Sequence, residues 1–295
     1  MPAAVQTWLD DDAVLARKTG QTRAEIDYIW SVVKDTLDKH YEQHHRQREP
    51  PLSPFASLLV TLHYLRVYPT TRDLADDLGT DHKRIRECLN HTLKALFDTL
   101  VPQGINHSPL PRQGYNTGIL AGVRLIVDAT FLPLPRTPNR KVFKKNFHFK
   151  SPMKQALKWQ IVVTTRGAPW HISKVVRGSV ADVTLLRESG VLDRLVGDAR
   201  MLADMGYIGE AKVITPKKKP KGGELKTEDK KNNRYINSKR AVVENCVGAF
   251  KEWSILRDVY RGPSSTAEDL EKVTEIVHVI GAMVKRKLTS RPLRA

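Results

Sequence analysis

The sequence predicts an α/β fold, in which a sheet flanked by helices follows an all-α region. Residues 122–128 form a short apolar run rich in β-branched side chains, as is typical of a buried strand, and 200–207 repeats this pattern more weakly. Helical periodicity extends over 234–259 and 265–287, whereas 1–102 shows only helical patterns. A chain of 295 residues has room for one sizeable core plus a small helical domain.

Helix-start signals and a linker divide the chain. Thr22 and Glu25 have capping-box spacing, and Ser53-Pro54 is typical of a helix cap followed by its first residue. Proline and glycine then gather between the helical region and the first apolar run. We therefore expect an N-terminal helical region over 1–50, a helix-turn-helix domain over 51–102, a linker over 103–118 and an α/β domain over 119–290.

A helix-turn-helix signature lies near residue 80. A helix over 71–78 is followed by Gly79-Thr80 and by a second helix that begins at Asp81. In this motif the second helix enters the major groove of DNA. The side chains that we expect on its exposed face are His82, Lys83, Arg84 and Arg86. Because the signature is short, a plain three-helix bundle used for packing or dimerisation is the alternative.

Two aspartates end the apolar runs. Asp128 closes the first run, and Asp204 lies in the second, with Gly206 giving the backbone freedom to turn just after it. We expect both carboxylates at the ends of neighbouring strands. An acid in such a place would be costly without a compensating charge. The alternative for each is a turn or helix cap.

Glu244 lies on a charged helix edge. At about 100° per residue, Arg240, Glu244 and Lys251 fall within roughly 40° of one another, beside the apolar stripe of the same helix. We expect Glu244 to meet the two aspartates while Arg240 and Lys251 hold phosphates. Carboxylate oxygens suit Mg²⁺ or Mn²⁺, and two such ions can activate water against a phosphodiester. A solvated glutamate on an amphipathic helix is the alternative.

The charge balance predicts a polyanionic partner. Lys and Arg total 49 against 32 Asp and Glu, a formal net charge of +17. The segment 136–158 contains eight Lys or Arg and no acid, directly after the Asp128 run. The residues of this segment that we expect to contact DNA are Lys144, Lys145, Lys154 and Lys158.

Aromatic residues accompany this basic segment. Phe143, Phe147 and Phe149 lie within it, and Trp159 follows. Basic residues interleaved with aromatics can track a nucleic-acid backbone and stack on unpaired bases. The alternative is that these rings form the core of a hairpin. A second basic block, 212–240, is rich in Pro, Gly and Lys and predicts a mobile loop that closes on DNA.

Taken together, these motifs resemble a family. The chain is similar to DDE transposases of the PIF/Harbinger and related bacterial insertion-sequence type. The matching segments are Val127-Asp128-Ala129-Thr130, Gly178-Ser179-Val180-Ala181-Asp182, Ala203-Asp204-Met205-Gly206-Tyr207, Asn233-Arg234 and Arg240-Ala241-Val242-Val243-Glu244. The resemblance implies a ribonuclease-H-like mixed sheet flanked by helices, with Asp128, Asp204 and Glu244 as catalytic metal ligands.

The resemblance also implies an activity. It predicts a metal-dependent DNA endonuclease and strand transferase with two Mg²⁺ or Mn²⁺ ions per active site. The expected partner is double-stranded DNA, both the terminal inverted repeats of the element and the target, bound by a homodimer or higher oligomer. The alternatives are a domesticated nuclease that cuts without joining and a helix-turn-helix regulator with an inactive site.

Asp182 has two interpretations. Ser179 and Asp182 have capping-box spacing before an apolar helical segment, which makes Asp182 part of a helix start. The second interpretation is that Asp182 also borders the active site. The residue pattern favours the helix start as the simplest role and leaves the second role open.

Absent features indicate the setting. We find no apolar run near 18 residues, no signal peptide and only two cysteines, Cys88 and Cys246. These observations predict an intracellular protein with no membrane partner, located in the cytoplasm or nucleoid of a bacterium or in the nucleus of a eukaryote. No phosphate-cradling glycine loop is present, which disfavours an ATP-driven enzyme.

Overall fold

A computed structural model describes residues 1–44, 50–103, 105–291 and 293, which form two compact units. The first unit comprises Met1–Gln103, Lys251–Asp258 and Glu275–Ala282, and the second comprises Gly104–Phe250, Val259–Thr274 and Met283–Ala295. Among the described residues, we find no helix with both the length and the apolarity needed to span a bilayer.

The first unit is helical throughout its described residues. Its helices are α1 (Ala3–Leu9), α2 (Asp12–Thr19), α3 (Arg23–His44), α4 (Pro54–Val67), α5 (Thr71–Asp77), α6 (His82–Leu100), α10 (Ser254–Arg257) and part of α11 (Ala267–Ser290). Helix α4 is buried around its whole circumference from residue 56 to residue 63, as expected for a central helix. The predicted cap of α4 at Ser53 is confirmed. Helices α1 and α2 were not predicted.

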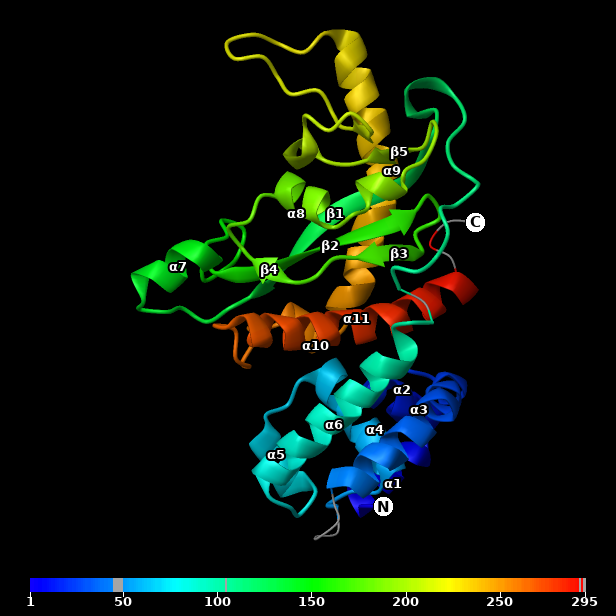
Figure 1. The fold of residues 1–295 in the computed structure, drawn as a ribbon, viewed down its shortest axis with the longest axis vertical. Coiled ribbons are helices and arrows are strands. Elements are labelled where there is room, and N and C mark those ends of the chain that lie inside the picture. The colour runs from blue at the N-terminus through cyan, green and yellow to red at the C-terminus, as the bar shows by residue number, and fades with distance from the viewer. Residues whose placement is uncertain (45–49, 104, 292, 294–295) are drawn as a thin grey trace. The chain divides into compact units, whose positions relative to one another are not determined.

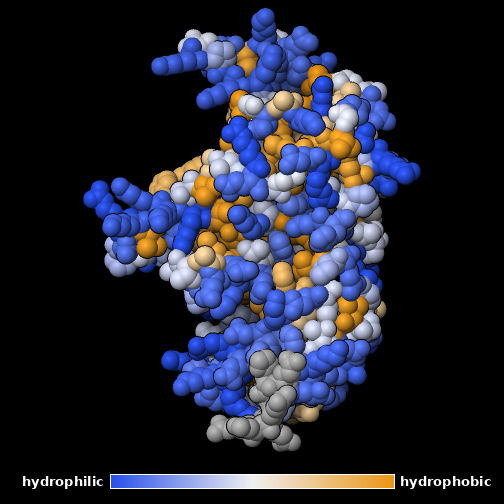
Figure 2. Space-filling model, in the orientation of Figure 1, coloured by the Kyte–Doolittle hydropathy of each residue, from blue (hydrophilic) through white to orange (hydrophobic). Residues whose placement is uncertain are grey.

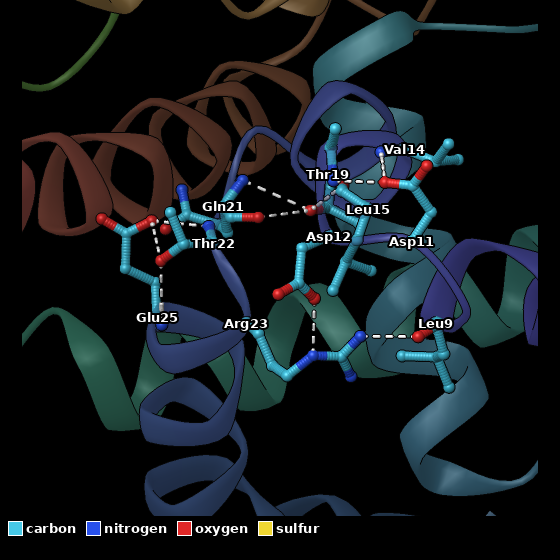
Figure 3. Close-up of polar contacts among 11 residues, drawn as sticks. Leu9, Asp11, Asp12, Val14, Leu15, Thr19, Gln21, Thr22, Arg23 and Glu25 are labelled. Carbon is cyan, nitrogen blue, oxygen red and sulfur yellow. Dashed lines mark hydrogen bonds and ion pairs between the residues drawn. The ribbon is translucent and has the colours of Figure 1, made fainter.

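Polar contacts fix the start of α3 (Figure 3). The backbone N–H of Thr22 donates to Glu25 Oε2 at 2.7 Å, and that of Glu25 donates to Thr22 Oγ1 at 3.3 Å, which confirms the predicted capping box. Arg23 Nε lies 2.7 Å from Asp12 Oδ1, and Arg23 Nη2 donates to the Leu9 carbonyl at 2.6 Å. One arginine therefore ties α3 to the ends of two short preceding helices.

Helices α5 and α6 are joined by a tight turn at a glycine, as predicted. Gly79 has φ +61°, a conformation that favours glycine, and the Thr80 N–H returns to the Ala75 carbonyl at 3.0 Å. Asp81 caps α6 through the Lys83 N–H. The side chains of Leu74 and Ile85 are buried, as the helix-turn-helix pattern predicts.

The second unit is built on a mixed sheet (Figure 1). Its strands are β1 (Val123–Pro133), β2 (Ala156–Thr164), β3 (Pro169–Ile172), β4 (Val176–Arg177), β5 (Arg200–Leu202) and β6 (Val213–Ile214). The order is β3-β2-β1-β5-β6, with β4 also paired to β2. Strands β1 and β2 are antiparallel, whereas β5 runs parallel to both β1 and β6.

Helices flank this sheet on both faces (Figure 1). The helices of the second unit are η1 (Gly118–Leu120), α7 (Arg140–Asn146), α8 (Asp182–Glu188), η2 (Leu192–Arg194), η3 (Met205–Tyr207), α9 (Thr227–Lys251) to its next-to-last residue, and the rest of α11. On one face, Leu125 and Val127 of β1 pack in a core cluster with Leu186 of α8. On the other, Asp128 faces Arg240 of α9, because successive strand residues point to opposite faces. The predicted ribonuclease-H-like α/β class, preceded by a helical region, is confirmed.

Two predicted boundaries were wrong. Strand β1 does not end at Asp128 but continues to Pro133, because its antiparallel pairing with β2 extends to the pair Pro133 and Ala156. Asp128 therefore lies within a strand. Helix α9 begins earlier than predicted and stops at Lys251, because Trp253 takes an extended conformation and is buried before α10 begins.

Candidate active site

Asp128 and Asp204 occupy equivalent positions relative to the neighbouring strands β1 and β5. The parallel pairing of β1 and β5 sets Ile126 opposite Leu202. Asp128 and Asp204 each follow two residues after these partners. β5 has already ended there, and Asp204 caps η3 by accepting the Gly206 N–H at 2.8 Å. The strand-end prediction thus holds for Asp204, whereas Asp128 is kept extended by β2.

The electrostatic environment of Asp128 joins the three acids. The pKa of this carboxyl is raised from 3.8 to about 6, mainly by burial, and the negative charges of Asp204 and Glu244 contribute to the rise. Arg240 opposes the rise, since its Nη2 lies 3.9 Å from Asp128 Oδ1. Both partners of this pair are largely shielded from water, the side chain of Arg240 being 11% exposed. The predicted acids are therefore close enough to affect one another.

The donor chemistry of this site fits a divalent cation. Three carboxylates that repel one another around a half-buried Asp128 form an oxygen-rich, negatively charged setting, which a hard cation would relieve. Glu244 itself is exposed. Within the residues that the structure describes, however, no group of three His, Cys, Asp or Glu side chains is drawn together as a cation would require. The charges favour a cation, but the side chains would have to close around it.

Asp182 lies beside Asp204. A Cβ added to Gly206 would sit 3.0 Å from Asp204 Oδ1 and 3.2 Å from Asp182 Oδ2, so the two carboxylates flank this glycine. Helix α8 begins at Asp182, as the helix-start interpretation expects. The capping box itself does not form, because Ala181 precedes α8 without a side-chain cap and Ser179 donates to the Lys145 carbonyl instead.

A buried polar network lies around Asp182 and Tyr207, and the sequence analysis did not predict it. Lys158 Nζ donates to Asp182 Oδ1 at 2.8 Å and to the Val180 carbonyl at 2.7 Å. Gln160 Nε2 lies 2.9 Å from the hydroxyl of Tyr207, which is fully buried. The signal was available, because Gln160 interrupts an apolar strand and a buried amide needs hydrogen-bond partners. The network anchors η3, on which Asp204 depends.

Comparison with known proteins places this geometry in a family. The profile described as DDE superfamily endonuclease matches residues 127–285, more than half of the chain. The chain belongs to the DDE superfamily endonucleases. It is also 29% identical over 250 residues to a protein of Microchaete diplosiphon named as the probable transposase for insertion sequence element IS702. That match covers 83% of this chain and 86% of the relative. No solved structure matches the chain.

Lys158 and Lys251, two residues of this DDE endonuclease that we predicted to contact DNA, are hydrogen-bonded within the protein instead. Lys158 is buried in the network described above. Lys251 is half-buried and its Nζ donates to the Leu256 carbonyl at 2.7 Å, while burial lowers the pKa of this lysine to about 7. Arg240 faces Asp128. These placements do not support direct DNA contacts by Lys158 or Lys251, because neither ammonium group faces solvent.

The remaining predicted DNA contacts lie on the surface. On α6 of this DDE endonuclease His82 is half-buried, whereas three basic side chains are exposed, namely Lys83, Arg84 and Arg86. On the segment between β1 and β2, the exposed lysines include Lys144, Lys145 and Lys154. Both sets are therefore exposed to solvent.

The aromatic residues of the basic segment fall into two groups. Trp159 is fully buried and Phe143 is half-buried, as the hairpin-core interpretation expects. Phe147 and Phe149 are exposed, which agrees with the stacking interpretation. Each interpretation therefore describes part of the set.

The lysine-rich loop before α9 is tied to that helix. Asn233 Oδ1 accepts the Lys217 N–H at 2.8 Å, and Asn233 Nδ2 donates to the Lys217 carbonyl at 2.9 Å. Lys217 Nζ also lies 2.7 Å from Asp229 Oδ1. The predicted loop exists between β6 and α9, but one end of it is held at the first turns of the helix.

Proposed function

We propose that this DDE endonuclease is a transposase, which binds the ends of a mobile element, cuts phosphodiester bonds there and joins the freed 3′ ends to target DNA. The observation that carries the proposal is the register of β1 and β5, which sets Asp128 and Asp204 at equivalent positions within the family match. The relative in Microchaete diplosiphon, named as a probable transposase, supports the same class.

Asp128, Asp204 and Glu244 are the proposed ligands of two divalent cations, Mg²⁺ or Mn²⁺. Such ions, when bound, activate a water and stabilise the leaving oxygen of a phosphodiester. The chain prepares the site in their absence, since Arg240 offsets part of the charge of Asp128 and the Gly206 N–H orients the carboxylate of Asp204. No covalent bond between enzyme and DNA is required.

The exposed basic face of α6 is the proposed contact with element ends. Lys83, Arg84 and Arg86 project from the helix that follows the glycine turn, where a recognition helix presents its base-reading side chains. The high positive charge of the chain supports binding of both element and target DNA. Because two ends must be joined in one reaction, we propose that the protein acts as a dimer or higher oligomer on DNA.

The test is a cleavage assay on labelled duplex DNA that contains the inverted repeats flanking the coding sequence. Wild type is compared with Asp128→Asn and with Asp193→Asn, an exposed acid on η2 that serves as the matched control. We expect wild type and Asp193→Asn to cut with Mg²⁺ and to be inactive in EDTA. Asp128→Asn should bind the DNA but cut at least about a hundredfold more slowly, because it loses a charged ligand.

Three results would count against the proposal. Cleavage that persists in EDTA would remove the metal role, and equal cleavage by Asp128→Asn would remove the proposed ligand. Binding without cleavage by the wild type in Mg²⁺ and in Mn²⁺ would favour a DNA-binding regulator. Cleavage that never yields joined products, in the presence of target DNA, would favour a nuclease that cuts without joining.

A further inference from the structure

The segment between β1 and β2, residues 134–155, forms an arm that contains α7 and ends in a short closed tip. In the tip, the His148 N–H donates to the Lys154 carbonyl at 3.0 Å, and Ser151 Oγ donates to the Gln155 carbonyl at 2.6 Å. A β-bridge pairs Phe147 with Gln155. The backbone of the tip is therefore fixed by its own hydrogen bonds, so its side chains are displayed from a defined frame.

Large apolar side chains of this tip are exposed to water. Phe149 is 66% exposed, Phe147 45% and Met153 46%, although the sheet beside them buries Trp159 completely. Exposed apolar side chains gathered in one place are typical of a binding surface. The ring of Phe149 is held in place by His148, on which it stacks at 5.8 Å between centroids and 9° between planes.

The surroundings of these rings are positively charged. The arm contains no acidic residue, and four of its lysines, Lys144, Lys145, Lys150 and Lys154, are exposed. Lys150 Nζ lies 5.7 Å from the centre of the Phe149 ring. Figure 2 shows the lobe at the left edge as strongly hydrophilic with a hydrophobic spot within it. Aromatic side chains surrounded by lysines suit a nucleic-acid ligand, because its bases can stack on the rings and its phosphates can pair with the lysines.

The tip of the arm packs against β1, the strand that carries Asp128. His148 stacks on Phe149 and, on β1, contacts Phe131 in a tilted arrangement, with 4.6 Å between the ring centroids. Phe131 lies three residues beyond Asp128 on β1, about 10 Å along the strand, and its side chain points to the opposite face of the sheet. Burial and the charge of Lys158 lower the pKa of His148 to about 4, so the middle ring of this stack is uncharged at neutral pH.

We propose that the tip of this arm is a stacking site for unpaired nucleotides of DNA, with bases on Phe149 and Phe147 and phosphates on Lys150. The inference rests on the proposed function for the source of its ligand, since cutting near a DNA end leaves unpaired nucleotides beside the acids. A protein partner fits less well, because an apolar patch enclosed by lysines without acids would require an acidic surface around its contact.

The test measures binding in EDTA, so that it does not depend on cleavage. Full-length protein is titrated into two fluorescent duplexes of identical sequence, one blunt and one with a six-nucleotide unpaired 3′ tail that contains 2-aminopurine. We expect the tailed duplex to bind more tightly and its 2-aminopurine fluorescence to be quenched on stacking. Phe149→Ala should weaken binding of the tailed duplex about tenfold and leave blunt-duplex binding unchanged, whereas Phe149→Trp should retain the preference.

A matched control is Val196→Ala, which removes another exposed apolar side chain of the second unit and should change neither value. Equal affinity of wild type for the two duplexes, or an unchanged tail preference in Phe149→Ala, would overturn the proposal. So would loss of self-association in Phe149→Ala with tail binding intact, since the patch would then bind protein. A wild type that fails to cut DNA but shows the Phe149-dependent preference would reject the transposase proposal alone.

Discussion

At the scale of single residues, Asp128 is held in an environment that disfavours its charge. Burial and two neighbouring acids raise the pKa of its carboxyl to about 6, and one arginine opposes them at 3.9 Å. A fold selected for stability alone would not gather acids in this way. The arrangement is physically reasonable for a site that binds a cation, because the cation would remove the repulsion.

This environment predicts that Asp128→Asn stabilises the metal-free protein at high pH. The folded-state pKa of about 6 lies above the unfolded value of 3.8, so ionisation penalises the folded state fully above pH 6 and not at all below pH 3.8. At pH 8 in EDTA the variant should be more stable by about 3 kcal/mol. Urea unfolding at several pH values tests this, and a gain that does not shrink as pH falls from 6 to 4 would contradict it.

Gly206 offers a second residue-scale prediction. Gly206→Ala would place a methyl group 3.0 Å from Asp204 Oδ1 and 3.2 Å from Asp182 Oδ2, so both carboxylates must shift. We expect DNA cleavage to fall about tenfold or more while the thermal midpoint changes little, because the position is exposed. Gly248→Ala on α9 is the control, since its added methyl group meets open space and should stabilise the helix by up to about 1 kcal/mol. Equal activity of both variants would argue against a precise carboxylate geometry.

At the scale of elements, short segments position the site by their attachment to longer ones. Helix η3 has only three residues, yet it is fixed at Asp204 by a cap and at Tyr207 by Gln160 of β2. The lysine-rich loop is fixed in a similar way, by Asn233 of α9 holding both backbone groups of Lys217. Side chains on regular elements thus define the conformation of segments that have little structure of their own.

The two hydrogen bonds from Asn233 to Lys217 should protect the lysine-rich loop from proteolysis. Asn233→Ala removes two hydrogen bonds to the backbone of Lys217, each with a net value of about 1 kcal/mol. We expect trypsin to cut the loop at residues 217–221 roughly five to twenty times faster under native conditions, with no loss of thermal stability. Asn232→Ala, one residue earlier on the same helix, is the control. Unchanged cleavage in Asn233→Ala would mean that other contacts hold the loop.

At the scale of the whole molecule, positive charge is in excess and is concentrated in places. The net charge of the chain is +17, and basic residues are concentrated in the acid-free arm, in the loop before α9 and on the exposed face of α6. Two basic residues are not available to a ligand, because the ammonium groups of Lys158 and Lys251 are hydrogen-bonded inside the protein. The formal charge therefore overstates the number of possible phosphate contacts.

DNA affinity should accordingly depend on salt with a slope that reports these contacts. Replacing Lys83, Arg84 and Arg86 together by alanine should reduce the slope of log K against log salt concentration by roughly two to three, at about 0.9 for each lost phosphate contact. Fluorescence anisotropy at several salt concentrations measures this slope. The control removes equal charge from three exposed residues elsewhere, Arg166, Lys174 and Lys272, and should reduce the slope less. An equal effect of the two triple variants would reject α6 as the binding face.

Local sequence determined the elements and the class of the fold. Capping signals at Thr22 and Ser53, the glycine turn at Gly79 and the apolar run before Asp128 each depend on neighbouring residues only, so they could be recognised without a structure. The three acids were also proposed as ligands from the sequence, with their motifs. The extent of β1 could not be, because it depends on pairing with a strand that begins more than twenty residues later.

Only the tertiary structure decided what surrounds each side chain. The pairing of β1 with β5 set Asp128 beside Asp204, and the packing of α9 turned Arg240 toward Asp128. Burial of Lys158 and exposure of Phe149 were equally beyond the sequence pattern. The physical reason is that pKa, exposure and hydrogen bonding depend on contacts between residues far apart in the chain, whereas periodicity and capping depend on residues within a few positions of each other.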